Sequence, residues 1–263
     1  MARRKKIVLS QIKTTAPDHL DKKKIKKKTN ELAKEIAELI KIMSANKKYS
    51  LLVVLQGMDS SGKDGVSKAV FSATPPTMVS AYGFKKPTDE EFAHDFLWRA
   101  HKQVPMKGEV KLFVRSHYED VLIQRVHKWI NKRKVDNRIK AINAFETLLQ
   151  EDNETIVMKF YLHLSKARQK EKLMERIEIV EKNYKHNDGD WEERKHWTKY
   201  RNAYQDVINR SEIPWEIVPA DSRWYRNYVV AKEVLKKLKS LKETYPPLAV
   251  SYTHLTLPTT PYV

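Results

Sequence analysis

The sequence predicts a three-layer α/β fold, in which helices cover both faces of a mostly parallel, five-stranded sheet. Short apolar segments alternate with longer segments whose apolar residues recur at helical spacing. The first apolar segment, residues 51–55 (LLVVL), contains no polar residue, which is typical of a parallel strand buried on both faces. A glycine-containing loop and another helical segment follow it directly. This alternation indicates strand–helix–strand units joined by right-handed crossovers.

The individual elements can be assigned in chain order from the same patterns. Strands are expected at residues 51–55, 78–82, 110–114, 155–162 and 215–218. Helices are expected from residue 32 to about 43 and at residues 64–71, 89–102, 116–129, 138–149, 165–180, 190–210 and 222–241. The aromatic residues of segment 190–210 recur mostly at helical spacing, which favours core packing over a platform for stacking bases: Trp191, Trp197, Tyr200 and Tyr204.

Three regions are expected along the chain: a basic helical extension (1–48), a main domain (49–245) and a tail (246–263). Residues 251–263 contain no Lys, Arg, Asp or Glu and are rich in Thr and Pro, so we expect the tail to be disordered or foreign to the domain. No segment has the length and apolarity of a membrane span, and the basic start lacks the apolar core of a signal peptide. A cytoplasmic protein that does not bind membranes is therefore expected.

The charge of the chain favours polyanionic partners. Its formal net charge is +18, which attracts nucleic acid, anionic membranes or a phosphate polymer. Six lysines within residues 22–28 form either a solvated helix face or a surface that docks a polyanion. The absence of cysteine excludes disulfides and thiolate zinc sites.

Residues 57–63 (GMDSSGK) match the phosphate-loop pattern G-x-x-x-x-G-K between the first strand and a helix. Glycines let backbone N–H groups turn toward phosphate oxygens, and Lys63 would neutralise the terminal phosphates. The motif usually continues with Ser or Thr, a magnesium ligand, but Asp64 stands there. Because a carboxylate beside phosphates is repulsive unless a cation bridges them, we infer that Asp59 serves Mg²⁺. The expected phosphate-binding residues here are Gly57, Ser60, Ser61, Gly62, Asp64 and Gly65.

A second acidic centre follows the third strand, in residues 115–120 (RSHYED). Neighbouring strands of phosphate-loop enzymes supply a second carboxylate directed at the metal, and Asp120 and Glu119 are candidates. Arg115 at the strand end could clamp a transferring phosphate. An ordinary helix start capped by Ser116 is the alternative, but it does not explain a cation at the positive end of a helix.

These motifs resemble those of the family-2 polyphosphate kinases. Residues 57–65 resemble that family's G-x-D-x-x-G-K-x-G loop, and four further segments match in order: residues 87–99, 115–122, 162–166 and 219–225. The resemblance covers about residues 20–245 and implies a phosphate-loop kinase-like fold with a helical lid at about 164–188. One departure is Val114, which stands where the family usually has Asn before the Arg-Ser pair.

The resemblance implies a Mg²⁺-dependent polyphosphate:nucleotide phosphotransferase, with Mn²⁺ as an alternative cofactor. Lys63 and Arg115 would then contact phosphate, and Asp59 and Asp120 would support the metal and the phosphoryl acceptor. Polymer contacts are expected at Lys68, Arg125 and Lys182, and acceptor contacts at Arg99 and Glu119. The expected partners are inorganic polyphosphate and nucleoside mono- or diphosphates, with no nucleic acid, and a homodimer or homotetramer.

Two alternatives stay open. One is a nucleotide or nucleoside kinase that uses ATP as the donor, because an Arg-Ser pair after a strand also resembles deoxynucleoside kinases. The other is a phosphate-loop protein that binds nucleic acid through its basic surface, which leaves Asp59 and Asp120 unexplained. AMP, ADP and GDP all remain candidate acceptors.

Overall fold

The computed structural model describes residues 6–248. Most of the expected tail, residues 249–263, lies outside the described residues, as do residues 1–5. Within the described part, no helix is both long and apolar enough to cross a bilayer.

A five-stranded sheet forms the middle layer, and all four of its strand pairings are parallel. The strand order is β2-β3-β1-β4-β5. The bounds are β1 Ser50–Gln56, β2 Val79–Gly83, β3 Val110–Val114, β4 Thr155–His163 and β5 Trp215–Pro219. The predicted α/β class and parallel sheet are confirmed, and the order reverses at β1, where ligands of such sheets bind.

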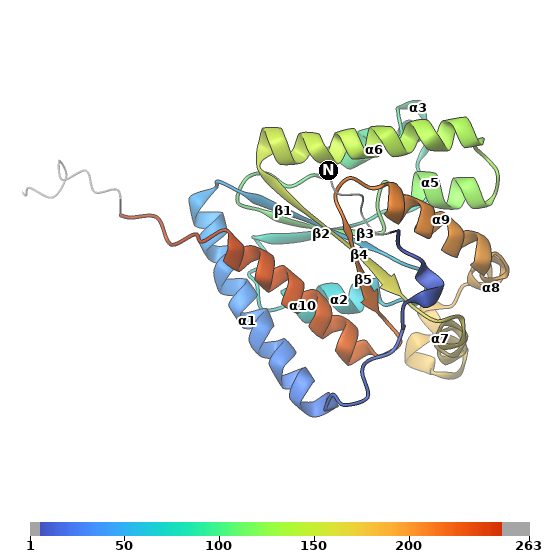
Figure 1. Ribbon diagram of the computed structural model, residues 1–263, viewed down its shortest axis with the longest axis horizontal. Helices are drawn as coiled ribbons and strands as arrows, with labels where there is room; N and C mark the ends of the chain where they lie inside the picture. Colours follow the sequence, from blue (N-terminus) through green and yellow to red (C-terminus); the bar gives the residue numbers. More distant parts are fainter. Residues whose placement is uncertain (1–5, 249–263) are drawn as a thin grey trace, which may run out of the picture.

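Helices cover both faces of the sheet (Figure 1). Alternate residues of β1 belong to different cores, since Leu52 and Val54 face one cluster while Leu51, Val53 and Leu55 face the other. The first cluster lies under α5 (Glu119–Val126), α6 (Lys132–Asn153) and α9 (Trp197–Arg210), and the second under α1 (Lys22–Asn46), α2 (Lys63–Phe71) and α10 (Arg223–Ser240). A strand buried on both faces explains the unbroken apolar run.

Two predicted helices are each divided in the structure. Segment 89–102 forms α3 (Asp89–Ala93) and α4 (Trp98–His101), because His94 is extended and the Asp95 side chain accepts a hydrogen bond from Leu97 N (2.9 Å). Such local side-chain bonds compete with helix formation. Segment 190–210 forms α8 (Asp188–Lys195) and α9, which are separated at His196.

Other helix boundaries also differ from prediction. The helix α5 begins at Glu119 and not at Ser116, whose hydroxyl accepts from Tyr118 N (3.2 Å) in the turn before it. The helix α1 begins ten residues before Leu32, at Lys22, where the Asp21 side chain caps it. The lysine run is therefore the first two turns of a helix. The remaining elements are the 3-10 helices η1 (Leu9–Gln11) and η2 (Val180–Lys185) and the helix α7 (Lys166–Glu178).

Trp197 and Tyr204 belong to the buried core, as their spacing predicts, and Trp191 and Tyr200 are half-buried.

A fully buried ion pair joins β4 to α6. Lys159 Nζ lies 2.5 Å from Glu146 Oε2 and donates a hydrogen bond to the Tyr118 hydroxyl (2.8 Å). Burial opposes the charge on Glu146, but Lys159 holds the pKa of that carboxyl below its usual range. Because Tyr118 directly precedes α5, this pair also fixes the turn that leads into the second acidic centre.

Removal of one partner should therefore be costly. We expect Lys159→Met to lower the free energy of unfolding by about 3–5 kcal/mol, since Glu146 would be left buried without its ion-pair partner. The double variant Lys159→Met/Glu146→Leu should recover a large part of that loss. Urea unfolding followed by circular dichroism measures both, and equal losses in the single and double variants would contradict this account.

Candidate active site

The phosphate loop joins β1 to α2 and needs its glycines. Gly57 and Gly62 have φ values of 154° and 88°, which side-chain-bearing residues rarely adopt. A Cβ at Gly62 would also lie 2.0 Å from Arg226 Nη1. Arg226 is buried on α10 and donates a hydrogen bond to Ser61 O (2.8 Å). The loop is thus held by a guanidinium that the sequence motif does not include and that also lines the cavity over the loop.

Three side chains of the loop offer polar groups for phosphate. The hydroxyls of Ser60 and Ser61 are buried, and neither has a hydrogen-bond partner among the described residues. Lys63 is buried and donates to Gly57 O (2.9 Å). Burial lowers the pKa of Lys63, while Asp59 opposes that shift. Buried hydroxyls normally have hydrogen-bond partners, so the position of these two suits an oxyanion ligand.

An ion pair connects the phosphate loop to the end of β3. Arg115 Nη2 lies 2.6 Å from Asp59 Oδ1. Burial alone would raise the pKa of Asp59, but Lys63 and Arg115 hold it below its usual range. Asp59 is therefore ionised at neutral pH. Arg115 has a φ of 61°, although its N–H still bonds to Leu55 O (3.1 Å), so its backbone leaves the sheet in a strained turn.

A strongly positive cavity of about 800 Å³ opens over the loop, and we call it the phosphate cavity. Eleven Lys and Arg side chains and four carboxylates line it. It brings together most of the predicted phosphate and metal residues: Asp59, Ser60, Gly62, Lys63, Asp64, Gly65, Lys68, Arg115 and Lys182. Lys182 comes from η2, in the expected lid, and binds Glu175 (2.7 Å).

A larger cavity of about 1340 Å³ lies between α3 and α6, and we call it the α3–α6 cavity. Its lining mixes aromatic side chains such as Phe92 and Trp129 with polar and charged groups. It contains the two residues predicted at the acceptor, Arg99 and Glu119. Its size and mixed lining suit a nucleotide-sized ligand.

Asp120 faces this second cavity and not the phosphate cavity. Its carboxylate accepts from Arg99 Nη2 (3.0 Å) and Gln124 Nε2 (2.6 Å). Burial raises the pKa of Asp120, although Arg99 opposes the shift. The structure therefore does not bring Asp59 and Asp120 into one cavity. Glu119, the other candidate acid, shares a small cavity of about 320 Å³ with Asp59.

Arg115 is the residue at which these spaces meet. It lines the phosphate cavity, the α3–α6 cavity and the small cavity between them. Asp59 and Glu119 raise the pKa of Arg115 even though burial opposes its charge. A permanently charged, planar donor thus stands where a group bound over the loop would approach a group bound beside α3.

Three of the predicted phosphate-binding residues, Gly57, Ser61 and Arg125, do not line the phosphate cavity, and some contributors were missed. Arg125 pairs with Asp206 on α9 (2.6 Å) and does not line the phosphate cavity. Sequence reasoning missed Arg226 and Gln169, whose Nε2 donates to Asp59 O (3.2 Å) from α7. It also missed Arg223, the first residue of α10. A cation at an expected helix start was the reason for assigning Arg115 to phosphate, and the same reasoning applies to Arg223.

Among residues 6–248, no group of three or more acidic or histidine side chains could hold a metal ion by itself. This does not argue against Mg²⁺, which binds through one or two carboxylates together with substrate phosphates and water. Asp59, an ionised carboxylate in the phosphate cavity, has the chemistry for such a site.

The environment of Glu119 predicts a pH-dependent stability. Burial raises the pKa of Glu119, so its contribution to stability is fully present below the ordinary glutamate pKa and is lost as pH rises through the raised value. Glu119→Gln should therefore raise the melting temperature relative to wild type at pH 7.5, and the gain should shrink at pH 4.5. Differential scanning calorimetry checks this. Glu178→Gln, exposed on α7, is the control, and a gain for Glu119→Gln that does not depend on pH would refute the argument.

Comparison with known proteins shows the family to which this chain belongs. The family model described as polyphosphate kinase 2 matches residues 19–246. An AMP/ADP-polyphosphate phosphotransferase of Meiothermus ruber is 40% identical over 82% of this chain and 81% of its own length. An ADP-polyphosphate phosphotransferase of Rhodopseudomonas palustris is 35% identical over 80% of this chain and 78% of its own.

Solved structures give the same result. The crystal structure of polyphosphate kinase 2 from Arthrobacter aurescens TC1 superposes with a TM-score of 0.89 at 37% identity, covering 93% of this chain and 89% of the other. The range matched by the family model spans the phosphate loop, the end of β3 and the segment expected to form the lid. The chain belongs to the polyphosphate kinase 2 family.

Proposed function

We propose that the chain is a polyphosphate:nucleotide phosphotransferase that moves a phosphoryl group between inorganic polyphosphate and a nucleoside mono- or diphosphate, in either direction. Family membership and the names of its relatives support this class of reaction. The observation that carries the assignment is Arg115, which stands between a highly cationic cavity and a nucleotide-sized one.

The two cavities suit the two substrates. A phosphate polymer has no bases, so charge and spacing alone must hold it, and eleven cations around one cavity provide this. A nucleotide needs apolar and aromatic surface for its base, and the α3–α6 cavity offers this beside Arg99. Polyphosphate is therefore assigned to the phosphate cavity and the nucleotide to the α3–α6 cavity.

In the forward direction, an oxygen of the acceptor's terminal phosphate forms a bond to the last phosphorus of the polymer. The bond from that phosphorus to the bridging oxygen breaks, and the shortened polymer leaves with that oxygen's electron pair. Little covalent chemistry is asked of the protein, so positioning and charge neutralisation provide the rate. Lys63 and the loop N–H groups hold the donor, and Arg115 neutralises charge on the transferring group.

We further propose Mg²⁺, with Mn²⁺ as an alternative, as the cofactor, which would supply neutralisation of phosphate charge when bound. Asp59 would hold it together with substrate phosphates and water. Asp120 is the second metal-directed residue expected from the sequence, but its bonds to Arg99 and Gln124 suit an anchor of the acceptor equally well.

The wider expectations from the sequence are retained as part of the proposal. We place the enzyme in the cytoplasm, where its nucleotide acceptors are found, and expect a homodimer or homotetramer. The segment that contains α7 and η2 would act as a lid that excludes water from the transferring phosphoryl group.

A direct assay tests the reaction. With AMP, ADP or GDP, polyphosphate and Mg²⁺, but no ATP, the next higher nucleotide should form, and EDTA should stop its formation. The KM for polyphosphate should rise with salt, because binding is electrostatic. Chromatography of the nucleotides gives the readout. Turnover that requires ATP as donor would instead indicate an ordinary nucleotide kinase, and tight oligonucleotide binding that polyphosphate does not displace would favour a nucleic-acid-binding protein.

The metal assignment can be tested with two similar ion pairs. Asp59→Asn should raise the Mg²⁺ concentration needed for half-maximal turnover by about 10- to 100-fold. Asp206→Asn is the matched control, since Asp206 forms an equally short 2.6 Å pair with Arg125 away from the phosphate cavity. The same Mg²⁺ dependence in both variants would contradict the role of Asp59. For Asp120→Asn, a raised Mg²⁺ requirement supports a metal role, and a raised nucleotide KM alone supports an acceptor role.

A further inference from the structure

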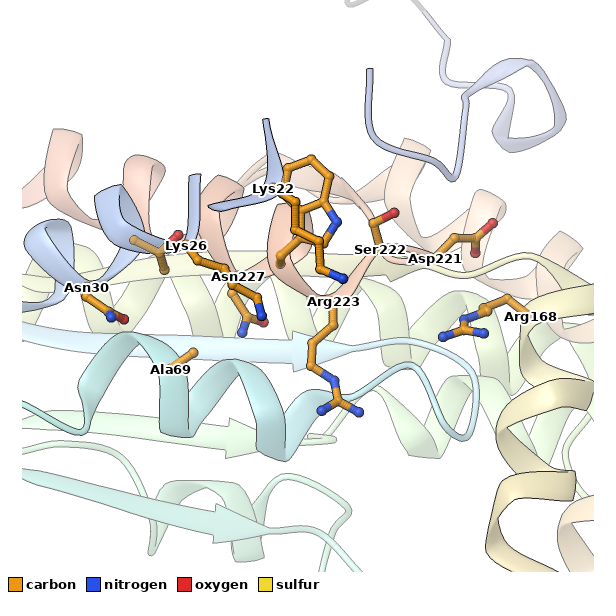
Figure 2. Close-up of a pocket in the computed structure, with 11 residues that line it drawn as sticks. Lys22, Lys26, Asn30, Ala69, Arg168, Asp221, Ser222, Arg223 and Asn227 are labelled. Atoms are coloured by element: carbon orange, nitrogen blue, oxygen red, sulfur yellow. The ribbon is translucent and has the colours of Figure 1, made fainter. Parts of the chain in front are cut away.

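A separate pocket of about 670 Å³ lies beside the phosphate cavity, where the starts of α1 and α10 approach α2, and we call it the distal pocket (Figure 2). In Figure 2, Lys26 lies along α1 at one end of the pocket, Arg168 of α7 lies at the other, and Arg223 lies between them. The charged residues that line it are Lys22, Lys26, Arg168, Arg223 and Asp221.

The cations of this pocket are largely unneutralised. Lys22 and Lys26 are one helical turn apart and therefore share a face of α1. Within residues 6–248, neither they nor Arg223 form an ion pair, whereas Arg168 pairs with Glu171. Like charges held together without partners favour an anionic ligand.

The single carboxylate of the pocket is already engaged with the protein. Asp221 Oδ2 accepts from the Thr14 hydroxyl (2.6 Å), and Oδ1 accepts from Ser165 N (2.8 Å). These bonds tie the N-terminal segment to the start of α7. Asp221 is thus committed to holding the fold together, and it does not pair with Lys22, Lys26 or Arg223.

The distal pocket is continuous with the phosphate cavity. The two share Asn30, Ala69, Arg168, Asp221 and Arg223 in their linings. A linear polyanion whose end lies over the phosphate loop can therefore pass Arg223 and reach α1 without leaving a cationic surface. The sequence left the lysine run of α1 as either a docking surface or a solvated face. Two of its members, Lys22 and Lys26, lie at the far end of that path.

We propose that the distal pocket binds the phosphate polymer several units from its reacting end, so that Lys22 and Lys26 make the enzyme favour long donors over short ones. This inference rests on the proposed function. The lysines do not contact the reacting phosphate, and they contribute only when a donor is long enough to occupy both the phosphate cavity and the distal pocket.

A nucleic acid is the competing ligand, because the indole of Trp224 also lines the pocket and indoles stack on bases. The polymer is favoured by the shared lining with a cavity that contains the phosphate loop itself. If the distal pocket bound a different polyanion from the phosphate cavity, the two would not need to share lining residues.

The test compares two double variants of the full-length chain that carry the same change in charge. Lys22→Ala/Lys26→Ala alters the face that lines the distal pocket, and Lys23→Ala/Lys27→Ala alters neighbouring exposed positions of the same helix. For each, kcat/KM is measured with long-chain polyphosphate and with tripolyphosphate. The ratio of the two values should fall about tenfold in the pocket variant and stay at the wild-type value in the control. The slope of log KM for the long donor against log salt should also decrease by about 2.

Each outcome bears on the proposal. Equal falls in both variants would show a general charge effect, and an unchanged ratio in the pocket variant would show that the pocket does not hold the donor; either result overturns the inference. It is also overturned if the pocket variant loses affinity for a single-stranded oligonucleotide while its polyphosphate ratio is unchanged. Wild-type protein that uses no polyphosphate of any length would instead refute the proposed function, so the two failures can be distinguished.

Discussion

Repulsion between like charges is the constraint on which the carboxyl edge of the sheet depends. The phosphate cavity gathers eleven cationic side chains against four carboxylates. The carboxylates do not cancel this excess but fix where individual cations stand: Asp59 holds Arg115, and Glu175 holds Lys172 and Lys182. A polyanion therefore meets charges that are already positioned, and it need not reorganise long, flexible side chains on binding. The excess positive charge of the phosphate cavity would attract the polymer.

Backbone strain at the same edge of the sheet also helps to position the charged side chains. Ser60 and Arg115 have φ values of 64° and 61°, conformations that cost a residue with a side chain about 1–3 kcal/mol each. Ser60 follows Asp59 in the phosphate loop, and Arg115 is the partner of Asp59 at the end of β3. The hydrogen bond from Arg115 N to Leu55 O keeps the strained turn in register with the central strand. The rigid parallel sheet thus supports a geometry that neither loop would adopt alone.

Features determined by neighbouring residues could be predicted from the sequence, whereas contacts between distant residues could not. The prediction placed β1 to within one residue at each end because a strand buried on both faces is continuously apolar at its centre, and the phosphate loop is recognisable because its backbone requires glycine. The single helix expected at 89–102 was wrong because the side chain of Asp95 competes for the backbone, a local effect that the apolar spacing hides. Arg226 could not be assigned, because its contact with Ser61 O joins residues 165 positions apart and leaves no periodic signal.

Glu119 and Asp120 show how one turn of α5 contributes side chains to neighbouring cavities. They are consecutive residues in the first turn of α5, and consecutive helical side chains point about 100° apart. Both line the α3–α6 cavity, but Glu119 also reaches the small cavity that it shares with Asp59, whereas Asp120 turns toward Arg99. A pair of acids that looks redundant in the sequence thus has two sets of contacts: Glu119 connects the α3–α6 cavity to the surroundings of Asp59, and Asp120 holds an arginine in the wall of that same cavity. Arg115 lines all three cavities, so under the proposed assignment of donor and acceptor one guanidinium would meet both substrates.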